Sequence, residues 1–425
     1  GEITPGDIMQ YISTGGYSAL NKALFEMSPE EVVEEVKSSG LRGRGGAAFP
    51  TGVKWSFLAP NKAPIKYVLC NCEEGDPGAY NDKGILETDP HTLVEGLILN
   101  GYATNSNKSY VFIRQGHDIP INAIERAIKE AYDKGLLGEN ILGSNFSFDM
   151  EVSLTGDSYV AGEETALMEA IEGKRSTPRF KPPFPAAAGL WQKPTNINNV
   201  KTISYVPQII KNGSDWFSST GTEKSSGTAI VCLSGHITRP GMYEIPMGMT
   251  IEEVLDEVGG GSNSDSDIKM LQTGGPLGGV LGKEAFGTKI DFDEMAKSGA
   301  ILGSGGIIVC NETVSVVDLI RNLVAFNQFE SCGKCFPCRL GNTHMFDVLQ
   351  RLADSESNPG DMELLERIGK SMKIGSLCGH GQLGYNPISS SLKYFESEII
   401  DSMNNKSEPL EAMLTPTRTR PNSAE

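Results

Sequence analysis

The chain has 425 residues, of which 39% are hydrophobic and 21% charged, a composition typical of a folded globular protein with a sizeable core. Acidic residues outnumber Lys plus Arg by 54 to 37, and the resulting net charge of −17 disfavours general nucleic-acid binding. The length predicts about three domains. No run approaches the ~20 apolar residues of a membrane span, and no secretory signal pattern is present, so we expect a cytoplasmic protein without disulfides.

The first 40 residues are predicted to be helical, with Ser28 as an N-cap in front of acidic residues. A glycine-rich loop follows at residues 41–55 and also carries Arg42, Arg44 and Lys54. Its backbone N–H groups and cations could bind an anion. A plain surface turn explains the glycines as well, because neither a Walker pattern nor a GxGxxG turn after a strand is present.

Strands alternate with amphipathic helices over the next hundred residues. Short apolar runs predict strands at 66–71, 109–114 and 148–155, and helical periodicity predicts helices at 92–104 and 119–134. This alternation predicts an α/β fold with a parallel sheet.

Carboxylates follow two of these strands, at the edge where open α/β sheets bind ligands. Glu73, Glu74 and Asp76 come directly after the first strand, and Glu163 and Glu164 lie at the start of a helix that follows the third. A solvated acidic turn would explain the first group. A favourable helix-dipole interaction of about 0.3–1 kcal/mol would explain the second.

Residues 174–201 are basic and rich in proline, in contrast to the acidic chain as a whole. Such a segment suggests an anionic ligand such as a dinucleotide. It ends in a run of asparagines, in which Asn198 and Asn199 could donate to phosphate or to a ring carbonyl.

The second half of the chain changes character. A Gly/Ser/Thr-rich stretch ending near residue 227 predicts a domain boundary. Strand and turn patterns with a helix at 251–258 follow, and a strand at 306–311 closes this small α+β unit. From Val314 onward the periodicity is helical, with further helices at 342–353, 360–373 and 387–403. Residues 405–425 lack periodicity, and we expect a poorly ordered tail or a docking strap.

The eight cysteines are unevenly distributed. Cys332, Cys335 and Cys338 are spaced C-x2-C-x2-C, and Cys378 follows at a distance. Three thiolates in one run with a remote fourth are typical of a [4Fe–4S] cluster. Zinc stays an alternative, although structural zinc usually takes its ligands as two pairs. We expect the other four to pack in the core: Cys70, Cys72, Cys232 and Cys310.

An iron–sulfur cluster accepts one electron at a time. An anionic ligand bound upstream would therefore be a redox cofactor that releases electrons singly, and a flavin suits that task.

Five motifs taken together resemble the NADH-binding flavoprotein subunit of respiratory complex I, over about residues 5–400: LRGRGG-x-x-FPTG-x-KW, GEETAL, KPPFP, W-x-KPT-x-INNV and ESCG-x-C-x-PCR. The resemblance implies an NADH dehydrogenase in which hydride passes from NADH to FMN, and single electrons pass to a [4Fe–4S] cluster and on to a quinone-reducing complex. The beta subunits of NAD-linked formate dehydrogenases and bifurcating hydrogenases are similar, so such a diaphorase subunit is one alternative. A non-catalytic iron–sulfur scaffold is another.

The fold that the resemblance implies has three parts. A Rossmann-like FMN- and NADH-binding domain with a parallel sheet would span residues 1–219. A small β-grasp (ubiquitin-like) domain would span 220–310, and a helical bundle with the cluster and the polar tail would span 311–425. Such a fold must bring Cys332 close to a flavin bound by residues near 50 and 160.

The resemblance also implies roles for individual residues. The FMN phosphate and ribityl chain would be held by Gly43, Arg44, Gly45, Gly46 and Lys54. The flavin would be met from the first strand by Asn71, Glu73 and Glu74. The isoalloxazine and nicotinamide would be lined by Tyr159, Gly162, Glu163 and Glu164, of which Tyr159 and Glu164 would be catalytic through position and charge. The phosphate side would be closed by Asn198, Asn199 and Thr202. The NADH adenine would be flanked by Phe49, Phe57 and Phe184, and a ribose would be approached by Asp76. The cluster would be held by Cys332, Cys335, Cys338 and Cys378.

Three positions depart from the family pattern. Cys72 interrupts the usual NAD[DE]E, Ala161 stands where a cysteine is common, and Lys201 replaces an acid near the phosphate side. The lysine could strengthen anion binding or shift the flavin potential. The implied partners are NADH, a thioredoxin-fold [2Fe–2S] subunit and a larger iron–sulfur subunit, with no nucleic acid and no direct membrane insertion. The implied location is the cytoplasm, peripheral to the inner face of the membrane through the complex.

Overall fold

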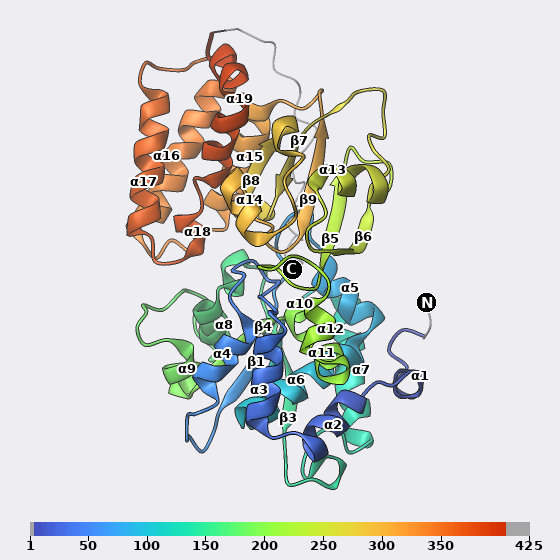
Figure 1. The fold of residues 1–425 in the computed structure, drawn as a ribbon. Helices are drawn as coiled ribbons and strands as arrows, with labels where there is room; N and C mark the ends of the chain where they lie inside the picture. Colours follow the sequence, from blue (N-terminus) through green and yellow to red (C-terminus); the bar gives the residue numbers. More distant parts are fainter. Residues whose placement is uncertain (1–3, 405–425) are drawn as a thin grey trace, which may run out of the picture.

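The structure is a computed structural model that describes residues 4–404, and Figure 1 shows its arrangement. A unit built on a parallel sheet forms one half of the molecule, and a second sheet and a helical bundle lie side by side in the other half. The tail predicted for residues 405–425 lies outside the described residues. In the part of the chain that is described, no helix is long and apolar enough to cross a membrane.

The predicted N-terminal helical region consists of α1 (Ile8–Ser13), α2 (Ser18–Glu26) and α3 (Pro29–Ser38). Ser28 caps α3 as predicted. Its hydroxyl accepts from the Glu31 N–H and the Glu31 carboxylate accepts from the Ser28 N–H, which is a capping box. The glycine-rich segment then runs into α4 (Thr51–Leu58), so Lys54 lies on a helix rather than in the predicted loop.

The first sheet has four parallel strands in the order β3–β2–β1–β4. Their bounds are β1 (Tyr67–Cys72), β2 (Lys108–Arg114), β3 (Asp149–Thr155) and β4 (Thr195–Asn199). The three predicted strands are confirmed, whereas β4 is missing from the prediction because its sequence TNINN is polar. The strand is nevertheless buried, since Trp55 and Asn100 donate hydrogen bonds to Asn198.

Helices cover this sheet on both faces (Figure 1). The predicted helices at 92–104 and 119–134 correspond to α6 (Pro90–Thr104) and α7 (Asp118–Asp133). The other elements of this unit are α5 (Asn81–Thr88), η1 (Ile141–Gly143), η2 (Tyr159–Gly162), α8 (Glu164–Ile171), α9 (Pro185–Ala188), η3 (Leu190–Gln192), α10 (Val200–Ser204), α11 (Val206–Asn212) and α12 (Ser214–Ser218).

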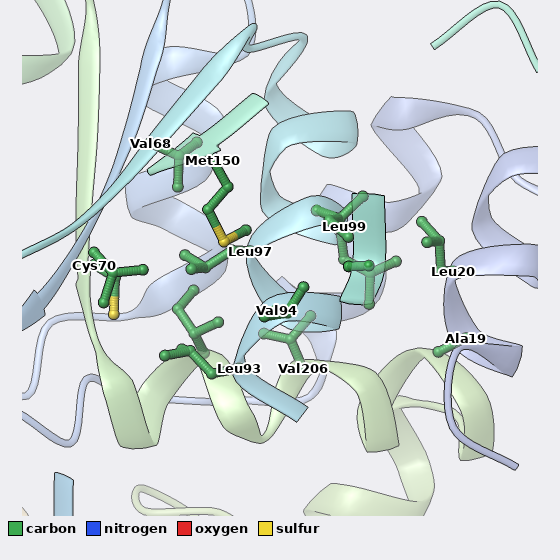
Figure 2. Packing of buried hydrophobic residues seen from close by; sticks show 14 of the residues in the cluster. Ala19, Leu20, Val68, Cys70, Leu93, Val94, Leu97, Leu99, Met150 and Val206 are labelled. Carbon is green, nitrogen blue, oxygen red and sulfur yellow. The ribbon is translucent and has the colours of Figure 1, made fainter. Parts of the chain in front are cut away.

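The largest hydrophobic core surrounds α6, which is buried on nearly all sides. In Figure 2, Leu93 and Leu97 of α6 lie beside Cys70 of β1 and Met150 of β3. The four cysteines outside the motif are buried and free, as predicted for plain core residues: Cys70, Cys72, Cys232 and Cys310.

The second sheet has five strands in the order β6–β5–β9–β7–β8. Strands β5 and β9 pair in parallel and the other pairs are antiparallel. The strands are β5 (Thr228–Gly235), β6 (Gly241–Pro246), β7 (Ile268–Thr273), β8 (Gly279–Gly282) and β9 (Gly306–Asn311). The predicted helix at 251–258 is divided into α13 (Ile251–Glu253) and η4 (Val254–Val258). The remaining elements are η5 (Gly275–Leu277), η6 (Lys283–Ala285) and α14 (Phe292–Ser298).

The bundle consists of α15 (Val316–Phe329), α16 (Phe336–Ala353), α17 (Asp361–Gly375), α18 (Gly379–Gln382) and α19 (Asn386–Asn404). Its core continues into the second sheet through Met270, Val280 and Cys310. Helix α16 begins at Phe336 rather than at the predicted residue 342. Pro337 favours this early start, because its missing N–H costs nothing in the first helical turn.

Candidate active site

Polar side chains gather at the carboxyl ends of the four parallel strands, where open α/β sheets bind ligands. Glu73 follows β1, Arg114 ends β2, Tyr159 follows β3 and Asn199 ends β4. The fold therefore brings three predicted segments, far apart in the sequence, to a single edge of the sheet.

Glu73 and Arg114 form a buried ion pair at the centre of this edge. Burial raises the pKa of Glu73 to about 7, although Arg114 acts to lower it. The Asn71 amide donates to the Gly162 carbonyl at 2.8 Å and so ties β1 to the turn before α8. A Cβ at Gly162 would lie 2.9 Å from a Glu73 carboxylate oxygen, so a larger residue would displace this carboxylate.

Two lysines face the Glu163–Glu164 pair. The Lys181 ammonium lies 2.5 Å from Glu164 and 3.3 Å from Glu163, and the Lys54 ammonium lies 3.4 Å from Glu164. Burial alone would raise the pKa of Glu164, but the two lysines lower it below its ordinary value. Glu163 is the N-cap of α8 rather than part of its first turn, and it accepts from the N–H groups of residues 165 and 166.

Glu74 belongs to a separate, buried group, although the resemblance placed it against the flavin. Its carboxylate accepts from the N–H groups of Asp82, at 2.8 Å, and Lys83, at 3.0 Å, at the start of α5. Burial raises the pKa of Glu74 to about 7, and nearby Asp82 raises it further. The Lys201 ammonium lies 2.9 Å from Asp82 and 2.7 Å from the Asn81 amide oxygen. Because Lys201 is occupied by these contacts, it does not face an anion directly.

The glycine-rich loop meets the end of β4. The Arg44 N–H donates to the Thr202 hydroxyl at 2.8 Å, and a Cβ at Gly45 would lie 2.6 Å from the Asn199 Cβ. Gly43 donates its N–H to the Phe49 carbonyl within the loop. Gly46 has a φ of +125°, and a Cβ there would meet no atom closer than 4.0 Å.

The Arg44 side chain does not point toward a phosphate site, in contrast to the expectation from the family. It is 3% exposed, and its guanidinium donates to three backbone carbonyls, those of Arg42, Ser226 and Thr228. A guanidinium carries five donors in a rigid fork and so can satisfy several acceptors at once. Arg44 therefore contributes to the glycine-rich loop through its backbone and not through its side chain.

The predicted phosphate-side residues are also bonded within the protein. The Asn198 amide oxygen accepts from Trp55 at 3.0 Å. Asn199 caps α10 and donates to Asp82 at 2.6 Å. Thr202 is fully buried and holds the loop through Arg44. The hydrogen bonds of these side chains therefore hold the end of β4 in place and are not directed at a ligand.

Tyr159 connects the sheet edge with the second sheet and the bundle. Its hydroxyl donates to Asp76 at 2.6 Å, and Ser304 donates to the other Asp76 oxygen at 2.5 Å. The Tyr159 N–H donates to Glu330 at the end of α15. Asp76 therefore lies between two hydroxyl donors and is not free to meet a ribose without a rearrangement.

Three aromatic side chains remain exposed beside the loop. Phe49 is 45%, Phe57 55% and Phe184 60% exposed, and the rings of Phe49 and Phe57 lie 6.3 Å apart. The Asn61 amide donates to Ala186, which holds α9 beside α4. Exposed aromatic faces around a glycine loop with open space fit a ligand that carries planar rings, as FMN and NADH do.

The four motif cysteines line a single cavity between the bundle and the first unit. Cys335 is the N-cap of α16, Cys338 lies in its first turn, and Cys378 is the N-cap of α18. Burial raises the pKa of Cys338 to about 11 and that of Cys378 to about 12. Thiols in such surroundings ionise when a metal centre offsets their charge.

The arrangement of these thiols fits a cubane. A cubane binds its four thiolates at separate corners, and the structure brings three thiols of one run and a fourth from a distant segment to the lining of one cavity.

The cysteine cavity adjoins the sheet edge, as the resemblance required. Val160 and Pro178, which flank α8, line the same cavity as the thiols, and Arg175 donates to the Cys332 carbonyl at 2.8 Å. Lys54 of α4 contacts Glu164 at the start of α8, the helix that Val160 and Pro178 flank.

Sequence reasoning missed several members of the site, namely Arg114, Lys181, Asp82 and Ser304. Arg114 could have been found, since it is the last residue of a predicted strand whose neighbour ends in acids. Ser304 could not, because it comes from the second sheet unit.

Known families match most of this site. Residues 36–208 match the Nuo51 FMN-binding domain and residues 318–402 match the NADH-ubiquinone oxidoreductase-F iron-sulfur binding region. Residues 230–281 between them match the SLBB domain.

Relatives match along nearly the whole chain. It is 44% identical over 398 residues to the NADP-reducing hydrogenase subunit HndC of Solidesulfovibrio fructosivorans, covering 94% of this chain and 81% of that protein. It is 43% identical over 390 residues to the NADH-quinone oxidoreductase F 2 subunit of Rhizobium meliloti, covering 92% and 93%. The crystal structure of an NAD+-reducing [NiFe]-hydrogenase in the H2-reduced state has a TM-score of 0.83 at 28% identity, covering 96% of this chain and 68% of that one.

Proposed function

The chain belongs to the family of the NADH-quinone oxidoreductase F subunits, and on that premise we propose how its own residues serve the reaction. It is an NADH dehydrogenase subunit that binds FMN and a [4Fe–4S] cluster and belongs to a multisubunit redox complex. When bound, FMN would supply the acceptor for one hydride (two electrons and a proton) from NADH and the means to release the two electrons singly to the cluster. The observation that carries the assignment is the cavity shared by the four thiols and Val160, which joins the sheet edge to the cluster site.

The charged residues at the sheet edge position the reactants. Lys54 and Lys181 keep Glu164 ionised, so Glu164 presents a fixed negative charge beside the flavin site. Arg114 holds the Glu73 carboxylate in place through their buried ion pair. Hydride transfer needs aligned rings and no side-chain acid or base, so these groups act through proximity and orientation.

The remaining roles follow from exposure and contact. The backbone of Gly43, Gly45 and Gly46 receives the FMN phosphate. The exposed rings of Phe49, Phe57 and Phe184 flank the nucleotide base. Tyr159 positions Asp76, and the thiols of Cys332, Cys335, Cys338 and Cys378 hold the cluster.

The finer organisation is part of the same proposal. Four hydrophobic cores of the described residues, two on the first sheet, one on the second sheet and one in the bundle, support domains at 1–219, 220–310 and 311–425. A thioredoxin-fold [2Fe–2S] subunit and a larger iron–sulfur subunit are the proposed partners, in a cytoplasmic complex peripheral to the membrane.

A hydrogenase-linked diaphorase subunit is the second candidate. The HndC hydrogenase protein and the F 2 oxidoreductase protein are about equally similar to the chain, at 44% and 43% identity. The name of HndC includes NADP, so comparing NADH with NADPH as electron donor tests which relative the nucleotide site follows.

The test uses the full chain loaded with FMN and reconstituted with iron and sulfide, under anaerobic conditions. NADH should bleach the flavin absorbance near ~450 nm, because the flavin takes the hydride, and should then reduce ferricyanide. Iron and acid-labile sulfide should be found in equal amounts. A bound flavin that NADH does not bleach would refute the assignment.

A further inference from the structure

One of the four cavity thiols lies within reach of two polar side chains. Cys338, in the first turn of α16, is buried, whereas the other three motif cysteines are partly exposed. Asn342 of the same helix and Ser331 of the preceding loop both place a polar atom within hydrogen-bonding distance of its sulfur. Hydrogen bonds to the sulfurs are among the factors that set the reduction potential of an iron–sulfur cluster.

The orientation of the Asn342 amide is fixed by the backbone. Asn342 lies one turn after Cys338, so the two side chains share a face of α16. The Asn342 side-chain nitrogen is 3.1 Å from the Cys338 carbonyl oxygen and 3.5 Å from the Cys338 sulfur. A carbonyl oxygen only accepts hydrogen bonds, so the group that faces Cys338 must be the NH2 of the amide. Asn342 therefore donates to both the carbonyl and the sulfur of one cysteine.

The other end of this amide is unfavourable for stability. Asn342 is fully buried, and its oxygen has no hydrogen-bond partner among the described residues. A Cβ at Gly384 would lie only 3.2 Å from this oxygen, so the surroundings are tightly packed. A buried acceptor without a partner lowers stability, and an apolar side chain of similar size would avoid that loss. What asparagine adds at this position is its pair of donors to Cys338.

Ser331 brings a second donor from outside the helix. Its hydroxyl oxygen lies 3.4 Å from the Cys338 sulfur, and the residue lines the cysteine cavity. The Gly333 N–H donates to the same oxygen at 3.3 Å and leaves the O–H of Ser331 free to donate elsewhere. A cysteine holds a metal as its thiolate, which has no proton to give. The hydroxyl is therefore the donor and the sulfur the acceptor.

Resting on the proposed function, we propose that Asn342 and Ser331 raise the reduction potential of the [4Fe–4S] cluster by donating hydrogen bonds to the sulfur of Cys338. One-electron reduction adds one negative charge to the cluster and its four thiolates, and no bond or proton is exchanged. Donors directed at a ligand sulfur stabilise this added charge, and they do so more strongly in a buried site of low dielectric constant. The reduced form is thereby favoured, which suits a cluster that accepts single electrons from a flavin.

Redox titration of the cluster, followed by EPR spectroscopy, measures the effect. The full chain, loaded with FMN and reconstituted with iron and sulfide, is titrated with dithionite in the presence of mediators. N342L removes the nitrogen donor and should lower the equilibrium constant of the one-electron reduction about tenfold, a shift of about 59 mV to a more negative potential. S331A should shift the potential in the same direction, and the double variant should shift it further than either single one.

T343V is the matched control. Thr343 is the next residue of α16, and its hydroxyl donates to the Arg339 carbonyl at 3.1 Å and not to a sulfur. T343V should therefore leave the potential at the wild-type value. Dithionite reduces the cluster without NADH, so a failure of NADH oxidation and a failure of this inference are distinguishable.

A second measurement needs no variant. In pulsed EPR of the reduced cluster, the unlabelled wild-type chain should show a 14N hyperfine coupling from the Asn342 amide. Labelling the asparagine side-chain amides with 15N should replace it by a 15N coupling, and N342L should lack both. A residue that only packed against the helix would give no such signal.

Three results would overturn the proposal. One is a wild-type potential in both N342L and S331A. Another is a shift in T343V as large as that in N342L, because a general disturbance of α16 would then be the cause. The third is a pulsed EPR spectrum of the wild-type chain that the 15N label leaves unchanged, and this result decides the matter even if N342L does not assemble its cluster.

Discussion

Of the three departures from the family pattern, the lysine at position 201 has the clearest structural consequence. Its side chain is buried, and its ammonium bonds to Asn81 and Asp82, with Glu74 nearby. We predict that K201M lowers the free energy of unfolding by about 3–5 kcal/mol, because it leaves a buried carboxylate without its cation. Urea denaturation followed by circular dichroism measures the loss.

The double variant K201M/D82N controls for the role of charge. Neutralising Asp82 removes the unpaired ion and should recover much of the stability, while the amide oxygen still accepts from Asn199. If the double variant is no more stable than K201M, Lys201 acts through packing and the electrostatic account is wrong.

Glu74 gives the chain a pH dependence with a defined sign. Its pKa is raised by burial from 4.5 to about 7, so between these values the folded chain holds a proton that the unfolded chain releases. The free energy of unfolding therefore falls as pH rises through this window, with a slope of at most about 1.4 kcal/mol per pH unit from this group.

We predict that E74Q flattens the curve of stability against pH, measured by urea denaturation. The exposed E257Q should leave it unchanged, and an equal slope in wild type and E74Q would contradict the prediction.

At the scale of single residues, spacing alone predicted four cysteines as cluster ligands, and the structure places all four around one cavity. The C-x2-C-x2-C run specifies its chemistry because three thiolates must reach separate metal corners. By contrast, Arg44 and Glu74 have the residue types of a phosphate or flavin site, yet the structure uses both inside the protein. The sequence identifies the chemical group at a position but not where its side chain points, because the contacts that orient the side chain come from elements far away in the chain.

At the scale of elements, the packing of α4 against α3 places Lys54 beside Glu164, at the proposed flavin site. A Cβ at Gly52 would overlap the backbone of Lys37 in α3. We predict that G52A separates the two helices and destabilises the chain by about 1–3 kcal/mol through overpacking. It should also weaken FMN binding to the apoprotein, measured by quenching of FMN fluorescence, because Lys54 moves away from Glu164.

Gly287 provides the matched control for this substitution. A Cβ there would meet no atom within 4 Å, and its φ is ordinary. G287A should therefore stay within about 0.5 kcal/mol of the wild type with unchanged FMN affinity. Wild-type FMN affinity in G52A would show that α4 does not position the site.

The elements that sequence reasoning predicted correctly are those with a strong apolar signal. Helix α7 has a clear helical period, whereas α6 and the strands β1 and β2 are apolar runs that are buried almost throughout. Strand β4 was missed because its sequence is polar, and its asparagines Asn196 and Asn198 find buried partners in Asn100 of α6 and in Trp55. Strands β7 and β8 border a glycine-rich turn, and the pairing of β7 with β9 is a long-range contact that local pattern does not contain.

At the scale of the whole molecule, Arg44 joins the first unit to the second. Its buried guanidinium donates to Ser226 and Thr228, at the start of β5, and lies over the Phe292 ring at 5.3 Å. Burial lowers its pKa to about 10, so the group stays charged at neutral pH. The glycine loop and the second sheet are thus held by the same side chain.

We predict that R44M loosens this junction and lowers the free energy of unfolding by about 3 kcal/mol or more, since three carbonyls lose their donor. R44K should recover little, because an ammonium cannot reach three acceptors arranged for a planar fork. Calorimetry should resolve separate transitions for the two units in R44M, and proteases should cut residues 219–227 faster.

The exposed Arg126, which donates a 3.4 Å hydrogen bond to the Pro5 carbonyl, serves as the control, and R126M should behave like the wild type. A single transition at the wild-type temperature in R44M would mean that the junction is held by other contacts, and Asn81, which donates to Ile230 and Ser304, would be the next residue to test.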